Sequence, residues 1–199
     1  PIYTGKSCLI KSMYYSLGAS INQMHPGWME IKPITIAKIE KDDINYIIFR
    51  HENYIVLFDD NFNIISKFTS IGNELSPFYE EFFDFKLKMT HSTSGESKTP
   101  LPSHYFLPFY IDQDSGWIKN WSSFDRLSEF KGWRNDIIEY HTGIKPNKYY
   151  ELKTDKAKLM EQKKDKEIEY SALERVYLRA LLQKNNSVSL NIDVEKFEN

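Results

Sequence analysis

The first residues whose types and spacing could do chemistry are Gly5, Lys6 and Ser7, close to the start of the chain. A phosphate-binding loop reads G-x-x-x-x-G-K-[ST] and leads directly into a helix. Backbone N–H groups of such a loop, together with the positive end of the helix, hold phosphate oxygens. Lys6 would reach the β- and γ-phosphates, and the Ser7 hydroxyl would bind Mg²⁺. These residues predict a site for a nucleoside triphosphate, although a G-K-S tripeptide also arises by chance.

The chain carries only the last part of this motif. The first glycine would stand one residue before Pro1, and both Pro1 and Tyr3 are unusual inside such a loop. A start within a motif favours a fragment of a longer protein. We expect Cys8 to be a buried, unreactive thiol behind the loop. The residues predicted to contact the nucleotide are Thr4, Gly5, Lys6, Ser7 and Cys8.

A second chemical candidate is Gln113, about a hundred residues after Lys6. The apolar run 105–111 (YFLPFYI) before it predicts a buried strand, in which Pro108 should lie near an end or a bulge. A glutamine at the end of this strand either caps the strand or faces the nucleotide. The run that ends in Asp59 imitates the apolar strand and carboxylate of a Walker B motif, but its position predicts a hairpin turn instead.

Hydrophobic spacing predicts the elements that must position these residues. Residues 5–17 predict a helix with one apolar stripe, ended by Gly18. The stripe consists of Leu9, Ile10, Met13 and Leu17. Four short runs rich in Ile, Val, Phe and Tyr predict an antiparallel meander with strands at 34–40, 44–50, 53–58 and 62–68. Further helices are expected at 74–85, 129–142 and 147 to about 183, loops at 20–33 and 90–103, and a strand at 188–194.

Composition limits the possible function classes. The chain has 199 residues, of which 41% are apolar and 15% aromatic, so a sizeable core can form. With a net charge of −2 there is no global basic excess, and any DNA contact would need a local patch. The single cysteine excludes an internal disulfide and fits a reducing cytoplasm. No apolar run is long enough to span a bilayer, and the histidines lack metal-binding spacing.

Two further clusters each allow a packing and a binding interpretation. The aromatic cluster could stack on bases, but core packing of a small helical subdomain is favoured. It consists of Trp117, Trp121, Phe124, Phe130 and Trp133. Lys145, Lys148 and Lys153 lie where the long helix begins and could contact the phosphates of duplex DNA. The alternative is a solvated helix face whose lysines are compensated by acidic neighbours.

In the order of its elements, nearly the whole chain resembles the SMC family of ABC-type ATPases and its DNA-repair relatives, the SbcC-like and RecN-like proteins. In that family an amino-terminal lobe runs from the P-loop helix through a β-meander to a strand that ends in the Q-loop glutamine. Helices and a long coiled-coil arm follow. The matching features here are Gly5-Lys6-Ser7, the 34–68 meander, Gln113 and the arm from Asn147. The wording of 107–143 is also similar to SMC-like proteins of bacterial defence systems such as the Lamassu type.

The resemblance implies a mixed α/β fold and a set of partners. The amino-terminal lobe, with its P-loop helix, β-meander and mixed sheet, would occupy 1–145, the root of the coiled-coil arm 146–184, and a linker or extra strand 185–199. ATP and Mg²⁺ would be the cofactors, with Gln113 touching Mg²⁺ and the attacking water. A second head would form an ATP-dependent homodimer, and double-stranded DNA and accessory or effector subunits would bind. The carboxy-terminal lobe, with its signature loop, Walker B carboxylate and switch histidine, cannot be placed in this sequence, so the 199 residues alone should be inactive.

Two other interpretations stay open. A stand-alone P-loop kinase or other nucleotide-binding enzyme would act without a second head, but the long helix after the domain argues against it. A non-catalytic scaffold with a degenerate loop would use only the coiled coil, and Pro1 and Tyr3 keep this reading open.

Overall fold

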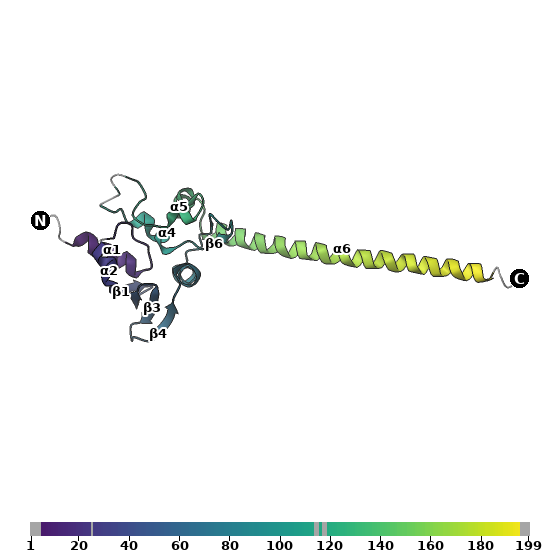
Figure 1. The fold of residues 1–199 in the computed structure, drawn as a ribbon, viewed down its shortest axis with the longest axis horizontal. Coiled ribbons are helices and arrows are strands. Elements are labelled where there is room, and N and C mark those ends of the chain that lie inside the picture. The colour runs from purple at the N-terminus through teal and green to yellow at the C-terminus, as the bar shows by residue number, and fades with distance from the viewer. Residues whose placement is uncertain (1–4, 25, 114–115, 117–118, 196–199) are drawn as a thin grey trace. The chain divides into compact units, whose positions relative to one another are not determined.

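The computed structural model describes residues 5–24, 26–113, 116 and 119–195. The chain divides into two compact units, Pro1–Tyr150 and Glu151–Asn199, here called the head unit and the arm unit. Figure 1 labels most of the elements. In chain order they are α1 (Lys6–Ser16), α2 (Pro26–Ile31), β1 (Ile34–Lys41), β2 (Ile44–His51), β3 (Tyr54–Asp59), β4 (Ile64–Phe68), the π-helical turn η1 (Ile71–Leu75), α3 (Ser76–Phe82), β5 (Met89–Thr90), β6 (Ser97–Lys98), α4 (Pro102–Phe106), the 3₁₀ turns η2 (Leu107–Phe109) and η3 (Leu127–Glu129), α5 (Trp133–His141) and α6 (Asn147–Glu195).

The four-stranded sheet has the order β1-β2-β3-β4 with every neighbour antiparallel, so the predicted meander is confirmed. Asp59 closes the hairpin between β3 and β4, where its carboxylate accepts hydrogen bonds from the N–H groups of Asn61 (2.9 Å) and Asn63 (2.8 Å). Its role in a turn is therefore as predicted. The predicted loop 90–103 includes a second, two-stranded antiparallel pair, β5 and β6. Among the described residues no strands pair in parallel, so the mixed sheet that the resemblance implies is not formed by them.

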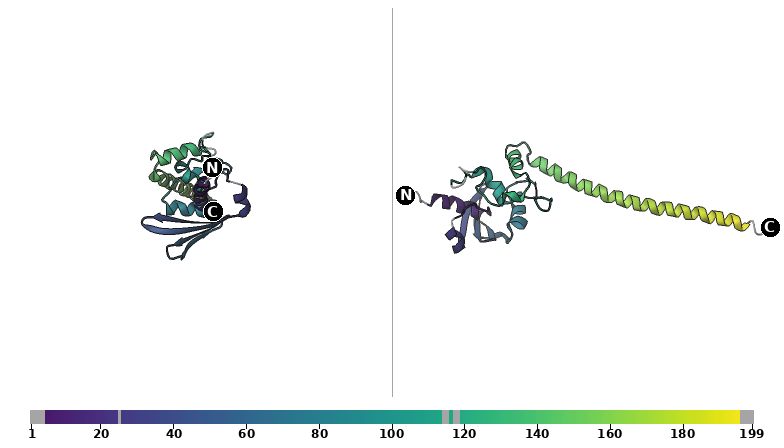
Figure 2. Two further views of the ribbon diagram at one scale, coloured as in Figure 1. Left: turned by 90° about the vertical axis from the view of Figure 1, so that its left-hand side faces the viewer. Right: turned by 45° about the horizontal axis from the view of Figure 1, so that its top comes forward.

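One face of the four-stranded sheet packs on the core of the head unit. Ile48, Ile55 and Leu57 point to this face and are 1–2% exposed. Figure 2 shows the strands as one layer, with helices of the head unit along one side. The other face carries a cross-strand row of Ile36, Phe49 and Val56, and Ile36 is 70% exposed. Since the exposed face of an antiparallel sheet is usually polar, this face departs from the ordinary pattern.

The end of α1 is fixed to the sheet and to η1. Gly18 adopts a φ of 87°, and a Cβ at this position would stand 2.4 Å from Leu75 Cδ2, so both backbone angle and space require glycine. Arg50 on β2 is buried, donates to the carbonyl oxygens of Tyr15 and Ala19, and stacks on the Tyr15 ring at 3.7 Å. Burial lowers the pKa of Arg50 from its usual value. A guanidinium at a helix carboxyl end is electrostatically favourable, and here it ties α1 to the sheet.

The predicted strand at 105–111 is wrong. This stretch forms α4, the 3₁₀ turn η2 and an extended segment from Tyr110. Pro102 occupies the first turn of α4, where a missing N–H costs nothing. The buried residues Ser103, Phe106 and Leu107 follow helical spacing, whereas Phe109 and Ile111 are exposed. A run of aromatic and apolar residues cannot distinguish these cases by composition alone.

The long helix α6 begins at Asn147 as predicted but continues through the expected break at 185–186. Its 49 residues include no proline or glycine, and asparagine lowers helix propensity only modestly, by less than about 0.7 kcal/mol relative to alanine. The strand predicted at 188–194 is therefore part of a helix, while 196–199 lie outside the described residues. Most side chains of α6 described beyond Glu151 are exposed. No helix in the described ranges is both long enough and apolar enough to cross a membrane.

Candidate functional site

The amino-terminal end of α1 carries the predicted phosphate-binding residues. Gly5 precedes the helix with a φ of 70°, a left-handed conformation that favours glycine. Lys6 is exposed and Ser7 is half-buried. The first turn of α1 contains no acidic residue. Thr4 lies outside the described residues. The described end of α1 is thus a positive helix terminus with a nearby lysine and hydroxyl, a combination suited to an anion.

The prediction of a buried Cys8 is wrong, because Cys8 is exposed. The same holds for most of the apolar stripe of α1: Leu9 is 72% exposed, Met13 46% and Ile10 44%. Only Leu17 of that stripe is buried. The buried side of α1 carries Lys11, Tyr14 and Ser16 instead. Most of the apolar stripe therefore faces away from the core of this chain, and α1 packs against that core with a polar and aromatic side.

Lys11 makes the contact that sets this orientation. Its Nζ lies 3.2 Å from Asp112 Oδ1, and the two side chains are 4% and 0% exposed. The same ammonium group donates to the carbonyl oxygen of Gln23 at 3.4 Å. This buried ion pair joins α1 to the segment that contains Asp112, 101 residues later in the sequence.

The segment before Gln113 is held at several further points. The Tyr14 hydroxyl donates to the carbonyl oxygen of Phe109 at 3.3 Å. The N–H of Asp112 donates to Ser123 Oγ at 2.9 Å, and Ser123 Oγ donates to the carbonyl oxygen of Tyr110 at 2.9 Å. Gln113 follows in a turn and is exposed, so it does not end a strand. Residues 110–112 therefore form an irregular segment, held by these contacts, that presents Gln113 at the surface.

The aromatic cluster packs largely as predicted. Phe124 and Phe130 are buried in the core, and the half-buried rings of Trp121 and Trp133 meet edge to face at 6.2 Å. Trp117 lies outside the described residues. Tyr14 belongs to the same core and contacts Phe124 at 5.6 Å between ring centroids. The packing interpretation is confirmed for the described members, and their rings help to seat α1.

His104 on α4 is a fully buried titratable base. Its exposed fraction is 0%, Nε2 lies 3.2 Å from the carbonyl oxygen of Leu127, and its ring meets Phe130 edge to face at 5.1 Å. Burial among these groups lowers the pKa of His104 to about 4. The imidazole is therefore neutral at physiological pH, with Nε2 as the donor, and it acts as a core residue.

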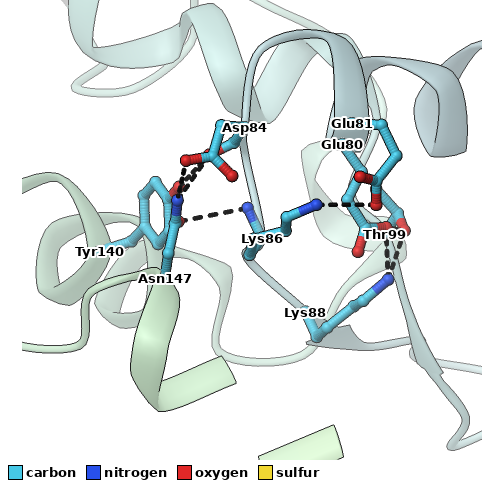
Figure 3. A network of polar contacts seen from close by, with 8 residues as sticks. All are labelled: Glu80, Glu81, Asp84, Lys86, Lys88, Thr99, Tyr140 and Asn147. Carbon is cyan, nitrogen blue, oxygen red and sulfur yellow. Dashed lines mark hydrogen bonds and ion pairs between the residues drawn. The ribbon is translucent and has the colours of Figure 1, made fainter. Parts of the chain in front are cut away.

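The first residue of α6 lies in a polar network with the chain after α3, drawn in Figure 3. Asn147 Nδ2 donates to the backbone oxygen of Asp84 at 2.7 Å and to its carboxylate at 2.9 Å. The Tyr140 hydroxyl donates to Asn147 Oδ1, which also accepts from the N–H of Lys86 at 3.4 Å. Burial raises the pKa of Tyr140 to about 12, so its hydroxyl stays protonated and can donate.

The predicted DNA-binding lysines are not equivalent. Lys145 forms an ion pair with Glu139 and lies over the Tyr149 ring at 5.5 Å. The hydrogen bond to Glu139 raises the pKa of Lys145. Lys148 and Lys153 are exposed. Lys145 thus has the compensating acidic neighbour that the solvated-face interpretation expects.

Sequence reasoning missed Lys11, Asp112 and Ser123. One signal was available: Lys11 interrupts an otherwise apolar and small run in the helix, four residues after Ser7. Asp112 directly precedes Gln113, but nothing in the sequence marks it as buried or paired. Neither residue identifies its partner, since the two are joined only by the folded chain.

Comparison with known proteins identifies relatives of part of this chain. It is 32% identical over 147 residues to Lamassu protein LmuB from Bacillus cereus (strain VD014), covering 73% of this chain and 25% of that protein. It is 28% identical over 113 residues to a Lamassu protein LmuB from Bacillus sp. (strain NCIM 5461 / CCTCC AB 2011126 / NIO-1130), covering 57% of this chain and 19% of that protein. The chain thus spans a quarter or less of the length of these curated relatives. No family model matches the chain, and no solved structure matches it significantly.

Proposed function

We propose that this chain is the amino-terminal part of an ATP-binding, SMC-like head in a Lamassu-type defence protein. The observation that carries the defence assignment is the similarity to LmuB, which extends over 73% of the chain. This similarity supports a subunit of a defence system acting against phage. The proposals of ATPase activity, of a bound nucleotide and of a DNA partner go beyond that similarity. They rest on the residues of α1, Gln113 and the start of α6.

The residues at the start of α1 fit a phosphate group. Gly5 leaves open space, because a Cβ at its position would meet no atom within 4 Å. The helix end has no competing carboxylate in its first turn, so its N–H groups suit an anion. Lys6 would hold the β- and γ-phosphates, and Ser7 would bind Mg²⁺. When bound, MgATP supplies the transferable phosphoryl group, and the protein supplies position and charge.

The link between α1 and the segment before Gln113 supports assigning Gln113 to the same site. Lys11 lies four residues after Ser7, about 6 Å along the helix axis, and it pairs with the residue before Gln113. The side-chain amide of Gln113 is exposed, so it could bind a water molecule without first breaking contacts in the core. We therefore keep Gln113 as the residue that contacts Mg²⁺ and water.

The head would work as one half of a pair. Leu9, Ile10 and Met13 are exposed on α1, and large exposed apolar groups gathered on one helix favour a covered surface. Other parts of the complete protein, including the carboxy-terminal lobe, and a second head across the nucleotide are the proposed cover. Double-stranded DNA would bind the pair, and accessory or effector subunits would respond to it.

Replacing Lys6 tests the nucleotide assignment in the complete protein. Lys6→Ala removes the cation proposed for the β- and γ-phosphates and should abolish ATP binding and turnover. Lys131→Ala, an exposed lysine of the head unit that precedes α5, is the matched control and should behave as wild type. Unchanged ATP affinity and hydrolysis in the Lys6→Ala protein would contradict the proposal and leave the scaffold interpretation.

Two further measurements separate the remaining alternatives. Gln113→Ala should leave ATP bound while hydrolysis slows. Association of heads that depends on ATP favours the SMC-like pair, whereas turnover by the 199-residue chain alone, lost in Lys6→Ala, favours a stand-alone enzyme.

A further inference from the structure

The ion pair between Lys11 and Asp112 is unusual because it buries two charged groups inside the head unit. Moving each charge out of water costs several kcal/mol, and the attraction between them offsets this cost only when geometry and hydrogen bonds are good. A pair of apolar residues of similar size is often as stabilising or more so. Stability alone therefore gives no reason for a lysine on the buried side of α1.

The pair has good geometry and additional hydrogen bonds. Tyr110 donates its hydroxyl hydrogen to Asp112 Oδ1 at 3.2 Å, and Lys11 Nζ lies 3.2 Å from the same oxygen. Ser123 fixes the Asp112 backbone from the other side, accepting its N–H at 2.9 Å. These contacts hold the Asp112 side chain against α1 and restrain the backbone that leads to Gln113.

The position of the pair is informative because each partner is next to a proposed site residue. Lys11 is four residues after Ser7 and so on the same side of α1. Asp112 immediately precedes Gln113. No helix or strand holds the extended segment 110–112, so the ion pair and the hydrogen bonds of Ser123 fix where Gln113 lies relative to α1.

We propose that Lys11 and Asp112 are positioning residues, which hold the segment carrying Gln113 in register with α1. This inference rests on the proposed function, because it assigns the pair a role only if Ser7 and Gln113 meet at one nucleotide. Neither Lys11 nor Asp112 is proposed to touch the nucleotide. Their removal should therefore affect turnover and the mobility of 110–113 while nucleotide affinity stays unchanged.

The test uses the complete protein with the double replacement Lys11→Met and Asp112→Leu, which exchanges the ion pair for an apolar contact. We expect ATP affinity to stay at the wild-type value and kcat to fall by on the order of 100-fold, as for a small misplacement of a reacting group. Hydrogen exchange of the 110–113 amides, measured without nucleotide, should become faster. The matched control is Lys88→Met with Glu80→Leu, which removes a partly buried ion pair elsewhere in the head unit and should leave kcat and this exchange unchanged.

A cycle with Gln113→Ala determines whether the pair acts through Gln113. In that background the Lys11→Met and Asp112→Leu changes should add no further loss of kcat. If the apolar pair fails to fold, Tyr110→Phe removes one hydrogen bond to the Asp112 carboxylate while the ion pair stays intact, and it should show the same split at smaller magnitude. An unchanged kcat with unchanged exchange, or losses that multiply with Gln113→Ala, overturns this inference alone. No ATP binding by the wild-type complete protein overturns both this inference and the proposed function.

Discussion

Two polar junctions in the head unit solve the same problem in different ways. Lys11 and Asp112 join α1 to an irregular segment through charges that are 4% and 0% exposed. Asn147 joins the first turn of α6 to Asp84 and Tyr140 through hydrogen bonds of its side-chain amide, one of them to the Asp84 carboxylate, at a more accessible place (Figure 3). Solvent can reach the second junction and replace a lost partner, whereas burial keeps solvent away from the first. Burial should therefore decide how much each junction costs to break.

The largest effect is expected from breaking the buried junction on one side only. Asp112→Ala leaves the Lys11 charge buried without its carboxylate and should lower the free energy of unfolding by about 3–5 kcal/mol. Chemical denaturation of the complete protein, with hydrogen exchange of the α1 amides to locate the loss, measures it. The Lys11→Met and Asp112→Leu double replacement should recover most of the loss. A loss below about 1 kcal/mol, the range of exposed pairs, would remove the distinction between the junctions.

The next effect concerns His104, a buried base whose ring is hydrogen-bonded to the backbone carbonyl oxygen of Leu127. Burial lowers the pKa of His104 to about 4, so between about pH 6.5 and pH 4 the unfolded chain binds a proton that the folded chain does not. Stability is complete above pH 6.5 and should fall by about 3 kcal/mol as the pH drops to 4. Denaturation midpoints of wild type and His104→Gln across this range test it. Parallel pH profiles for the two proteins would contradict the assignment.

A smaller effect is expected at the accessible junction. Asn147→Ala removes the donor to Asp84 and the acceptor for Tyr140, and should lower stability by about 1–2 kcal/mol. The change should be confined to the first turn of α6 and the 84–86 backbone, where amide exchange becomes faster. Asn73→Ala, an exposed asparagine on η1, is a control that should leave this region unchanged. A loss equal to that of Asp112→Ala would mean that burial does not rank the two junctions.

The smallest effect on stability is expected at the lysines where α6 begins. Reversing Lys145, Lys148 and Lys153 to glutamate should change the free energy of unfolding least of all, since the Lys145–Glu139 pair is partly exposed. If duplex DNA lies there, affinity should fall for all sequences alike, and the salt slope should become shallower by nearly one unit per lost contact. Titrations at two salt concentrations measure this. Identical curves for wild type and variant would exclude these lysines from the DNA surface.

The elements were predictable where one local pattern dominated. The β-meander has short apolar runs between polar turns, and α6 has a long stretch without proline or glycine, so both follow from nearest-neighbour chemistry. The segment 105–111 was not predictable in this way, because aromatic runs suit a strand, an α-helix or a 3₁₀ turn equally. Pro102 and Pro108 were the available signals, and they mark helix starts at least as well as strand ends.

The candidate site divides along the same line. Gly5, Lys6, Ser7 and Gln113 were selected from residue type and order, and their roles remain predictions. The structure adds that α1 and the Gln113 segment are joined, and it corrects Cys8, which is exposed. Amphipathic spacing shows which side of a helix is apolar, but which side is covered depends on the neighbour that packs against it.

By itself, the sequence determined the meander, the start and helical character of α6, the turn at Asp59 and the helix that follows Gly5. These depend on contacts between residues a few positions apart. Only the tertiary structure decided that Lys11 lies on the buried side of α1, that Asp112 is its partner, and that Leu9 and Met13 face outward in this chain. A buried charge is tolerated only where compensating partners converge on it, which for Lys11 are the Asp112 carboxylate and the carbonyl oxygen of Gln23. That convergence joins residues about a hundred positions apart, and no local pattern records it.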